Sequence, residues 1–197
     1  QDVVWHLLSK EPTRTDHLDS LKNACLDEQL SNVDIFTLNH DTVLEQFLLQ
    51  NVIQITDGFG EVVNNVRYWK PDLFESRVSK IRLFKLHGSV NWFRFQPDHG
   101  GWSNEAIGIP LDWDFWHTKN SQGQMQLPVD GRPMFLTGTF NKILQYTSGI
   151  YADIHCQFHR SLRDIQRLVI CGYGFGDKGI NTRVLEWVYQ SPNHRIM

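Results

Sequence analysis

Polar residues that directly follow an apolar run are the first candidates for chemistry. The run Val33–Leu38 is short, apolar and rich in β-formers, which predicts a buried strand. Asn39 and Asp41 come next, and the apolar spacing over Thr42–Gln50 predicts a helix behind them. An amide that donates and accepts, beside a carboxylate at a helix N-terminus, could orient a ligand or a water. The simpler alternative is that Asp41 only caps the helix, with Thr42 at its first position.

A histidine at the end of a second apolar run is the next candidate. Ile81–Leu86 predicts a strand, and the sequence His87-Gly88-Ser89 ends it. With glycine beside it, the imidazole is expected to face a cleft without steric cover, and its ordinary pKa suits proton exchange near neutrality. The alternative is a structural histidine bonded to a backbone carbonyl, which must describe most of the nine histidines.

The third candidate is a glycine-rich turn near the end of the sequence. Arg167–Cys171 predicts a buried strand, 172–177 a turn, and Ile180–Tyr189 a helix. Glycines let the backbone approach a phosphate or ribose closely, and the following helix N-terminus favours an anion. Asp177 stands where a strict G-x-G-x-x-G motif has its last glycine, so the alternative is a tight connection with Asp177 or Asn181 as the cap.

The elements around these stretches alternate between strand and helix. Helices are expected over His17–Leu30 and Gly149–Asp164, and further strands over Val52–Thr56, Val90–Phe95 and Met134–Thr137. This β-α-β rhythm predicts an α/β fold with a mostly parallel sheet flanked by helices. Open sheets of this kind bind ligands at the carboxyl ends of their strands, where the first two candidates stand.

Residues 96–133 lack regular periodicity and predict an inserted, loop-rich segment. Tryptophans gather in and beside it, at Trp92, Trp102, Trp113 and Trp116. The segment could be a lid, a partner surface or the core of a small subdomain. Packing is the favoured role, because aromatic clusters usually bury themselves.

The bulk composition is that of a soluble globular protein. A length of 197 residues, with 41% apolar and 21% charged residues, predicts a single domain over 1–197. A net charge of −3 gives no reason to expect nucleic-acid or membrane binding. No run approaches the roughly 18 apolar residues of a membrane span, and no secretory signal is visible. Three distant cysteines add to the expectation of a reduced, cytoplasmic protein.

The motifs TLNHD, KLHGS and VICGYGFGDKGIN, in this order, resemble the sirtuin superfamily. They resemble more closely the sirtuin-like NAD-hydrolase domains of bacterial anti-phage defence proteins. Thr37, Asn39 and Asp41 match the family's T-x-N-x-D motif, and His87 precedes Gly88 as the family's catalytic histidine precedes a glycine. The resemblance implies a Rossmann-like sheet.

The resemblance also assigns a set of nucleotide-binding residues from all three motifs. The later turn contributes most of them, because it is similar to the family's G-Y-S-F-x-D-x-x-I-N form. The residues so assigned are Thr37, Gly88, Gly172, Tyr173, Gly174, Phe175, Asp177 and Asn181.

Two features depart from the family pattern. Residues 88–133 contain no cysteine, so the zinc ribbon of the deacylases is absent, the Trp-rich insert replaces it, and no metal is expected. The family's G-A-G-x-S phosphate loop has no counterpart before Val33, where no glycine occurs. Either the N-terminal half of the nucleotide site lies outside this sequence, or the domain is partial or degenerate.

The reaction that the resemblance implies is hydrolysis of NAD, as substrate, to ADP-ribose and nicotinamide in bacterial defence. Asn39 would orient a water or the ribose hydroxyls, Asp41 would engage the nicotinamide side or the cationic ribose, and His87 would act as general base. The alternatives are an NAD-dependent protein deacylase and a non-catalytic nucleotide-binding module. A sensor domain or partner protein outside this sequence is expected as the regulator, and a homo-oligomer is a further expectation.

Overall fold

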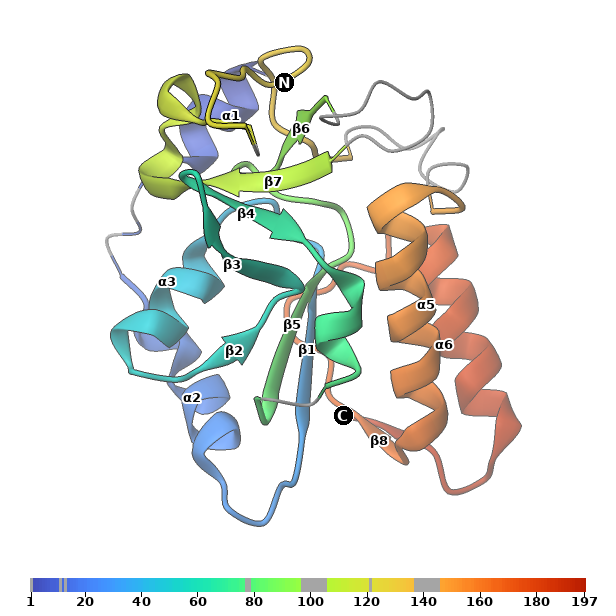
Figure 1. Ribbon diagram of the computed structural model, residues 1–197. Coiled ribbons are helices and arrows are strands. Elements are labelled where there is room, and N and C mark those ends of the chain that lie inside the picture. Colours follow the sequence, from blue (N-terminus) through green and yellow to red (C-terminus); the bar gives the residue numbers. More distant parts are fainter. Residues whose placement is uncertain are drawn as a thin grey trace. The chain divides into compact units, whose positions relative to one another are not determined.

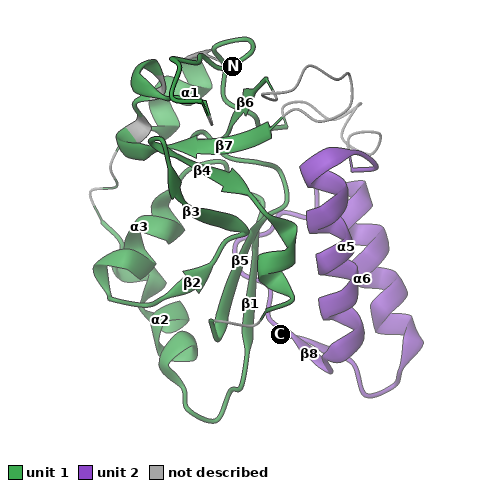
Figure 2. Cartoon of the chain, in the orientation of Figure 1, with its two compact units in different colours: residues 1–136 green, residues 137–197 purple. Residues whose placement is uncertain are grey.

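Residues 2–10, 12, 14–76, 79–96, 106–120, 122–136 and 146–197 are described by the computed structural model of this chain. The chain divides into two units, residues 1–136 and 137–197 (Figure 2). Each unit is described by itself below. The expectation of one domain over the whole chain therefore stays a prediction.

A parallel sheet positions the candidate residues of the first unit. Its strands are β1 (Val33–Thr37), β5 (Ile81–Lys85) and β2 (Ile55–Thr56), in the order β1-β5-β2 (Figure 1). In the register of β1 and β5, Thr37 pairs with Lys85, so both strands end at the same level. The residues that follow the two strands therefore begin at one edge of the sheet. The predicted α/β fold with a mostly parallel sheet is confirmed in this arrangement.

The two faces of this sheet bury different side chains, because successive residues of a strand point to opposite faces. On one face, Ile35 and Leu83 pack with the helices α2 (Asp19–Leu26) and α3 (Val43–Gln50) around the fully buried Leu48.

The opposite face of the sheet carries the other residues of the ladder. Phe36 stacks on Phe84, with 4.5 Å between ring centroids. Two residues earlier along the ladder, on the same face, Asp34 and Arg82 form an ion pair of 2.5 Å. The two cross-strand pairs together specify the register of β1 against β5.

An antiparallel sheet, which the sequence did not predict, completes the first unit. Its strands are β3 (Phe59–Val63), β4 (Val66–Trp69), β7 (Ala106–Pro110) and β6 (Phe93–Phe95), in the order β3-β4-β7-β6. The hairpin β3-β4 turns at two asparagines with φ of 52° and 66°, the backbone that tight hairpin turns require.

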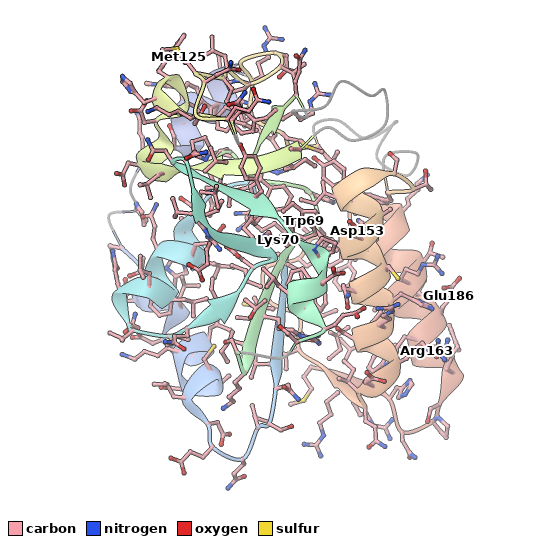
Figure 3. All side chains as sticks on the ribbon, in the orientation of Figure 1. Trp69, Lys70, Met125, Asp153, Arg163 and Glu186 are labelled. Carbon is pink, nitrogen blue, oxygen red and sulfur yellow. The ribbon has the colours of Figure 1, made fainter. Side chains whose placement is uncertain are left out.

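Aromatic rings connect the two sheets of this unit. Trp92 lies 5.3 Å from Phe59, and Phe59 lies 5.2 Å from Trp69, measured between ring centroids. Trp69, at the end of β4 in Figure 3, lies 5.7 Å from Phe74, which stacks on Phe84 at 4.4 Å. These contacts lie on the face of the parallel sheet that carries Phe84.

The segment 96–133, predicted to be an inserted, loop-rich segment, contains strand β7, which pairs with both β4 and β6. The role expected of the tryptophans is met by Trp92, which is 3% exposed, but Trp116 is 62% exposed. Trp102 lies outside the described residues, as do 97–105 and 121.

The predicted strand Val90–Phe95 is shorter than expected, because its first residues turn. The amide of Trp92 donates to the carbonyl of Ser89, and the amide of Val90 donates to the carbonyl of His40. Strand pairing therefore starts only at Phe93.

The remaining helices of the first unit are short. Met125, which follows the last of these helices along the chain, is 73% exposed and is labelled in Figure 3. In the described part of the chain no helix is long and apolar enough to cross a membrane. These helices are α1 (Asp2–Leu8), η1 (Asp16–Leu18), η2 (Pro71–Phe74), η3 (Leu111–Trp113) and η4 (Phe115–His117).

The second unit contains two helices and a short parallel pair of strands. They are α5 (Gly149–Asp164), β8 (Arg167–Leu168), α6 (Lys178–Gln190) and β9 (Arg195–Ile196). The predicted helix over Gly149–Asp164 is confirmed, and Figure 3 shows Asp153 and Arg163 on it and Glu186 on α6.

The buried strand predicted over Arg167–Cys171 is wrong. Strand β8 covers two residues and pairs in this unit with β9, and Val169 is 72% exposed. A continuous apolar run is typical of a strand covered on both faces, whereas here the side chains alternate between half-buried and exposed.

The three cysteines, all described, are free thiols in different surroundings. Cys25 lies in the core of the first unit, and burial raises the pKa of its thiol. Cys156 and Cys171, both in the second unit, are exposed. Thiol reactivity requires access and thiolate formation, so Cys25 is expected to be inert.

We predict that Leu48→Ala lowers the free energy of unfolding by about 2–5 kcal/mol, because it leaves a cavity in the core beside α3. Leu49→Ala, one residue further along the same helix, is the matched control, since Leu49 is 78% exposed. It should change stability by less than about 0.5 kcal/mol. Chemical denaturation of both variants measures the difference, and equal effects would contradict the assignment of the buried face.

Candidate functional site

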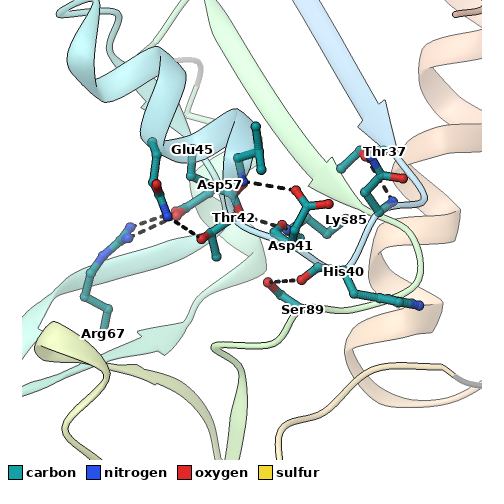
Figure 4. A network of polar contacts seen from close by, with 12 residues as sticks. Thr37, His40, Asp41, Thr42, Glu45, Asp57, Arg67, Lys85 and Ser89 are labelled. Atoms are coloured by element: carbon teal, nitrogen blue, oxygen red, sulfur yellow. Dashed lines mark hydrogen bonds and ion pairs between the residues drawn. The ribbon is translucent and has the colours of Figure 1, made fainter. Parts of the chain in front are cut away.

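The loops after β1 and β5 are tied together at the carboxyl edge of the parallel sheet. The carbonyl of His40 accepts a hydrogen bond from the amide of Val90 at 2.9 Å. It also accepts one from the hydroxyl of Ser89 at 3.2 Å, which Figure 4 shows. Ser89 is fully buried. The two loops that carry the first and second candidate motifs therefore form one hydrogen-bonded edge.

The T-x-N-x-D residues of the first loop differ in exposure and in bonding. The hydroxyl of Thr37, which is buried, accepts a hydrogen bond from the amide of Asn39 at 3.1 Å and so holds the turn. Asn39 is exposed. An oxygen of Asp41 accepts a hydrogen bond from the amide of Val43 at 3.0 Å, which stabilises the start of α3. The N-cap of α3 is Thr42 and the helix begins at Val43, so the alternative that made Asp41 the N-cap is wrong by one residue.

A buried lysine anchors this loop, and the sequence analysis missed it. The Lys85 side chain, at the end of β5, is 4% exposed, and its ammonium group donates to Glu45 at 2.9 Å and to the carbonyl of Asp41 (Figure 4). Burying an ammonium group is costly unless its donors are satisfied. The signal that could have identified it is a lysine within an otherwise apolar strand end, Phe-Lys-Leu.

His87 is placed at this edge but is not open to solvent. It is 4% exposed, and its ring centroid lies 6.0 Å from that of His40. The expectation of an imidazole facing an uncovered cleft is therefore wrong in this structure. Gly88 permits the turn because its φ is +79°, a backbone angle that residues with a side chain rarely adopt.

The segment that lies along His87 comes from a distant part of the sequence. The amide of Leu136 donates to the carbonyl of His87 at 2.8 Å, and Phe135 forms a β-bridge with Gly88. The ring of Phe135 lies 4.9 Å from that of His40. The sequence predicted a strand at Met134–Thr137 without its partner, and Thr137 lies outside the described residues.

The glycine-rich turn belongs to the second unit and has open space beside its backbone. Gly172 has a φ of +66°. A side chain built at Gly172, Gly174 or Gly176 would meet nothing within 4 Å. Packing within this structure therefore does not explain why these three positions are glycine, whereas close approach of a ligand to the backbone would.

The other predicted residues of this turn form one hydrogen-bonded network. Asp177 caps α6 by accepting from the amides of Gly179, at 2.9 Å, and Ile180, at 3.1 Å, as the alternative predicted. The hydroxyl of Tyr173 donates to the carbonyl of Asp177 and to the side chain of Asn181, at 3.1 and 2.7 Å.

The same network fixes Phe175 and connects to a second tyrosine. The Asn181 amide donates to the carbonyl of Phe175 at 2.7 Å, and Phe175 holds a φ of +54°. The hydroxyl of Tyr146 donates to Asp177 at 2.6 Å. Burial and this hydrogen bond raise the pKa of Tyr146, so the phenol stays protonated and remains a donor to the cap.

The structure thus brings together the predicted residues of each unit. The residues that follow β1 and β5 at the shared edge of the first unit are Thr37, Asn39, Asp41, His87 and Gly88. Of the two side chains with the sharpest predicted roles, Asn39 is exposed and His87 is buried. The remaining predicted residues share the turn in the second unit. Within the described ranges, no group of three or more histidine, cysteine or acidic residues could hold a metal ion.

We predict that Lys85→Met lowers the free energy of unfolding by about 3 kcal/mol, because it leaves the Glu45 carboxylate without its cation. The double variant Lys85→Met with Glu45→Gln should recover part of this loss, since no charge is then left unpaired. The exposed Lys119, changed to Met, is the control. Thermal or denaturant unfolding compares the four proteins, and equal stability of all of them would refute the anchoring role.

We predict a smaller loss for Asp177→Ala, about 1–2 kcal/mol, because the first turn of α6 loses its capping oxygen. Asp177→Asn should keep most of the stability, because its amide oxygen can still accept from the same amides. The control is Asp164→Ala, an exposed acid at the end of α5 that should not be destabilising. Circular dichroism during denaturation reports all three, and an undamaged Asp177→Ala protein would contradict the network.

A comparison with known protein families covers both the strand-end edge and the glycine-rich turn. The sequence matches the family model described as the SIR2-like domain over residues 33–196, which includes both. A comparison with curated proteins gave no match. Since the family match covers most of the 197 residues, the chain belongs to the SIR2-like domain family.

Proposed function

We propose that this chain is an NAD+ hydrolase, which cleaves the nicotinamide–ribose bond to give ADP-ribose and nicotinamide. Membership of the SIR2-like family implies an NAD-related activity. The observation that carries the finer proposal is the strand-end edge, where His40 ties the loop of the exposed Asn39 to the loop of His87.

Cleavage of this bond passes through a transition state that resembles an oxocarbenium ion, so the site needs positioning and charge more than covalent chemistry. In the proposal, the Asn39 amide orients a water or the ribose hydroxyls. The Asp41 carboxylate, with one oxygen committed to the helix, offers negative charge to the nicotinamide side or to the cationic ribose. His87 accepts the proton of a ribose hydroxyl or of the water, a role that requires its buried ring to become accessible to the substrate.

The turn of the second unit is proposed to contact the ribose-phosphate part of the substrate. Its own geometry supports this role: the backbone at Gly172 and Gly174 has open space beside it, and the α6 N-terminus follows. Tyr173, Phe175, Asp177 and Asn181 act by holding the turn, because their hydrogen bonds connect the turn to the start of α6.

The biological setting is part of the same proposal. We propose bacterial anti-phage defence in the cytoplasm, with activity restrained by a sensor domain or a partner protein and with assembly into homo-oligomers. An enzyme that consumes NAD must be held inactive in healthy cells. Three free thiols agree with a reducing compartment.

We predict that Asn39→Ala and His87→Ala each lower the rate of NAD+ consumption by about 100-fold or more, because each removes a group that positions or deprotonates the attacking oxygen. Asn39→Ala is the cleaner test, since an exposed side chain can be removed without a cavity. Chromatography of nicotinamide and ADP-ribose from the purified chain measures the rate.

The control is His117→Ala, because the His117 side chain is 76% exposed. A circular dichroism spectrum checks that His87→Ala, which opens a buried position, is still folded. A folded double variant of Asn39 and His87 that turns over NAD+ at the full rate would refute the proposal. Turnover that requires an acyl-lysine peptide would instead identify a deacylase, and absence of both activities would favour the non-catalytic module.

A further inference from the structure

A tyrosine that belongs to none of the three motifs contacts both helices of the second unit. The ring of Tyr146 lies on the imidazole of His155 in α5, with 3.8 Å between the ring centroids. It also lies against Gly179 in the first turn of α6, where a Cβ would meet Cε2 of Tyr146 at 2.9 Å. Tyr146 precedes α5 in the sequence, so these contacts fix the ring at the start of both helices.

The contact with Tyr146 explains why residue 179 is a glycine. Glycine is unfavourable inside a helix, so its presence at this position calls for a physical reason. A side chain at Gly179 would come too close to the tyrosine ring, whereas one at Gly172, Gly174 or Gly176 would meet nothing within 4 Å. One glycine therefore admits the ring of Tyr146, and the three glycines of the turn leave their space open.

The hydroxyl of Tyr146 connects this ring to the turn through Asp177. Oδ2 of Asp177 accepts from the Tyr146 hydroxyl at 2.6 Å, and Oδ1 accepts from the amides of Gly179 and Ile180. The carbonyl of Asp177 accepts from the hydroxyl of Tyr173, which lies within the turn. Asp177 is thus bonded to Tyr146, to the start of α6 and to the turn at once.

The backbone of the turn has a conformation that its neighbours must hold. Phe175 has a φ of +54°, which is unfavourable for a residue with a side chain and persists only where surrounding contacts fix it. Its ring is 55% exposed, and its carbonyl accepts from the Asn181 amide. A turn that is already held in one open form binds a ligand without the cost of being ordered first.

We propose that Tyr146 is a positioning residue for nucleotide binding. Through Asp177, it holds the turn in the form that leaves the backbone of Gly172 and Gly174 open to the ribose-phosphate part of the substrate. Tyr146 itself does not touch the substrate. This inference rests on the proposed function, because the ligand of the turn is taken to be NAD+.

Binding of ADP-ribose to the full chain tests this role without any turnover, and isothermal titration calorimetry gives the affinity. Tyr146→Phe keeps the ring and removes the hydroxyl, so it should weaken ADP-ribose binding by about tenfold. The matched control is Tyr189→Phe, because Tyr189 on α6 is 86% exposed. Its affinity should equal that of the unaltered chain.

Two glycine variants test the same contact and the place of the ligand. Gly179→Ala favours the helix but displaces the ring of Tyr146, so it should also weaken binding by about tenfold. Its effect should not add to that of Tyr146→Phe, since both changes break one contact. Gly174→Ala puts a methyl group into the open space and, without the positive φ of Gly172, should fold normally and still weaken binding.

The kinetics of NAD+ consumption separate positioning from a merely structural role. Tyr146→Phe should raise KM by about tenfold and change kcat by less than about threefold, because the reacting groups are elsewhere. A purely structural role would reduce the amount of active protein, which lowers kcat and leaves KM unchanged. Unfolding curves check that every variant is folded at the assay temperature.

Three outcomes would overturn the proposal. They are an unchanged affinity of Tyr146→Phe for ADP-ribose, fully additive effects of Tyr146→Phe and Gly179→Ala, and no binding of ADP-ribose to the unaltered chain at millimolar concentration. A chain that shows the expected binding pattern but does not consume NAD+ would contradict the proposed hydrolysis and support the role of Tyr146. The two failures are therefore distinguishable.

Discussion

The strand-end site of this SIR2-like domain depends on one buried ammonium group. Lys85 holds the carbonyl of Asp41 and the carboxylate of Glu45 together, and the charge is buried at a cost that these acceptors offset. This is possible only in the register that pairs Thr37 with Lys85, because a shift by one residue would turn Lys85 to the other face of the sheet. The ion pair and the aromatic stack on that other face therefore also determine the geometry of the site.

Local patterns in the sequence were enough to predict the parts of the fold that depend on local order. The apolar run before Asn39, the run before His87 and the periodicity over Gly149–Asp164 each predicted the right element, with ends within about one residue. The meeting of the first two motifs followed from the parallel sheet alone, since parallel strands end at the same edge. The capping role of Asp177 was also visible as an alternative, because aspartate before a helix favours it.

The features that the sequence did not predict arise from contacts between distant residues. Strand β7 pairs with β4, which lies about forty residues earlier in the sequence, and the segment 96–133 has no periodicity that predicts this strand. The burial of His87 depends on the segment that ends at Leu136, whose partner could not be read from its own residues. Arg167–Cys171 was misjudged for a related reason: an apolar run does not reveal how many strands will cover it. The Lys85 anchor was missed because a polar residue at a strand end is ordinarily exposed.

The cysteine thiols of the two units differ in how accessible they are to reagents in solution. The thiol of the first unit is sealed in a core, whereas both thiols of the second are exposed, and Cys171 directly precedes the turn that begins at Gly172. A thiol-directed fluorophore or spin label added to the unmodified chain would therefore attach to the second unit alone. Such a label beside Gly172 would report on the turn while leaving the strand-end edge with its native side chains.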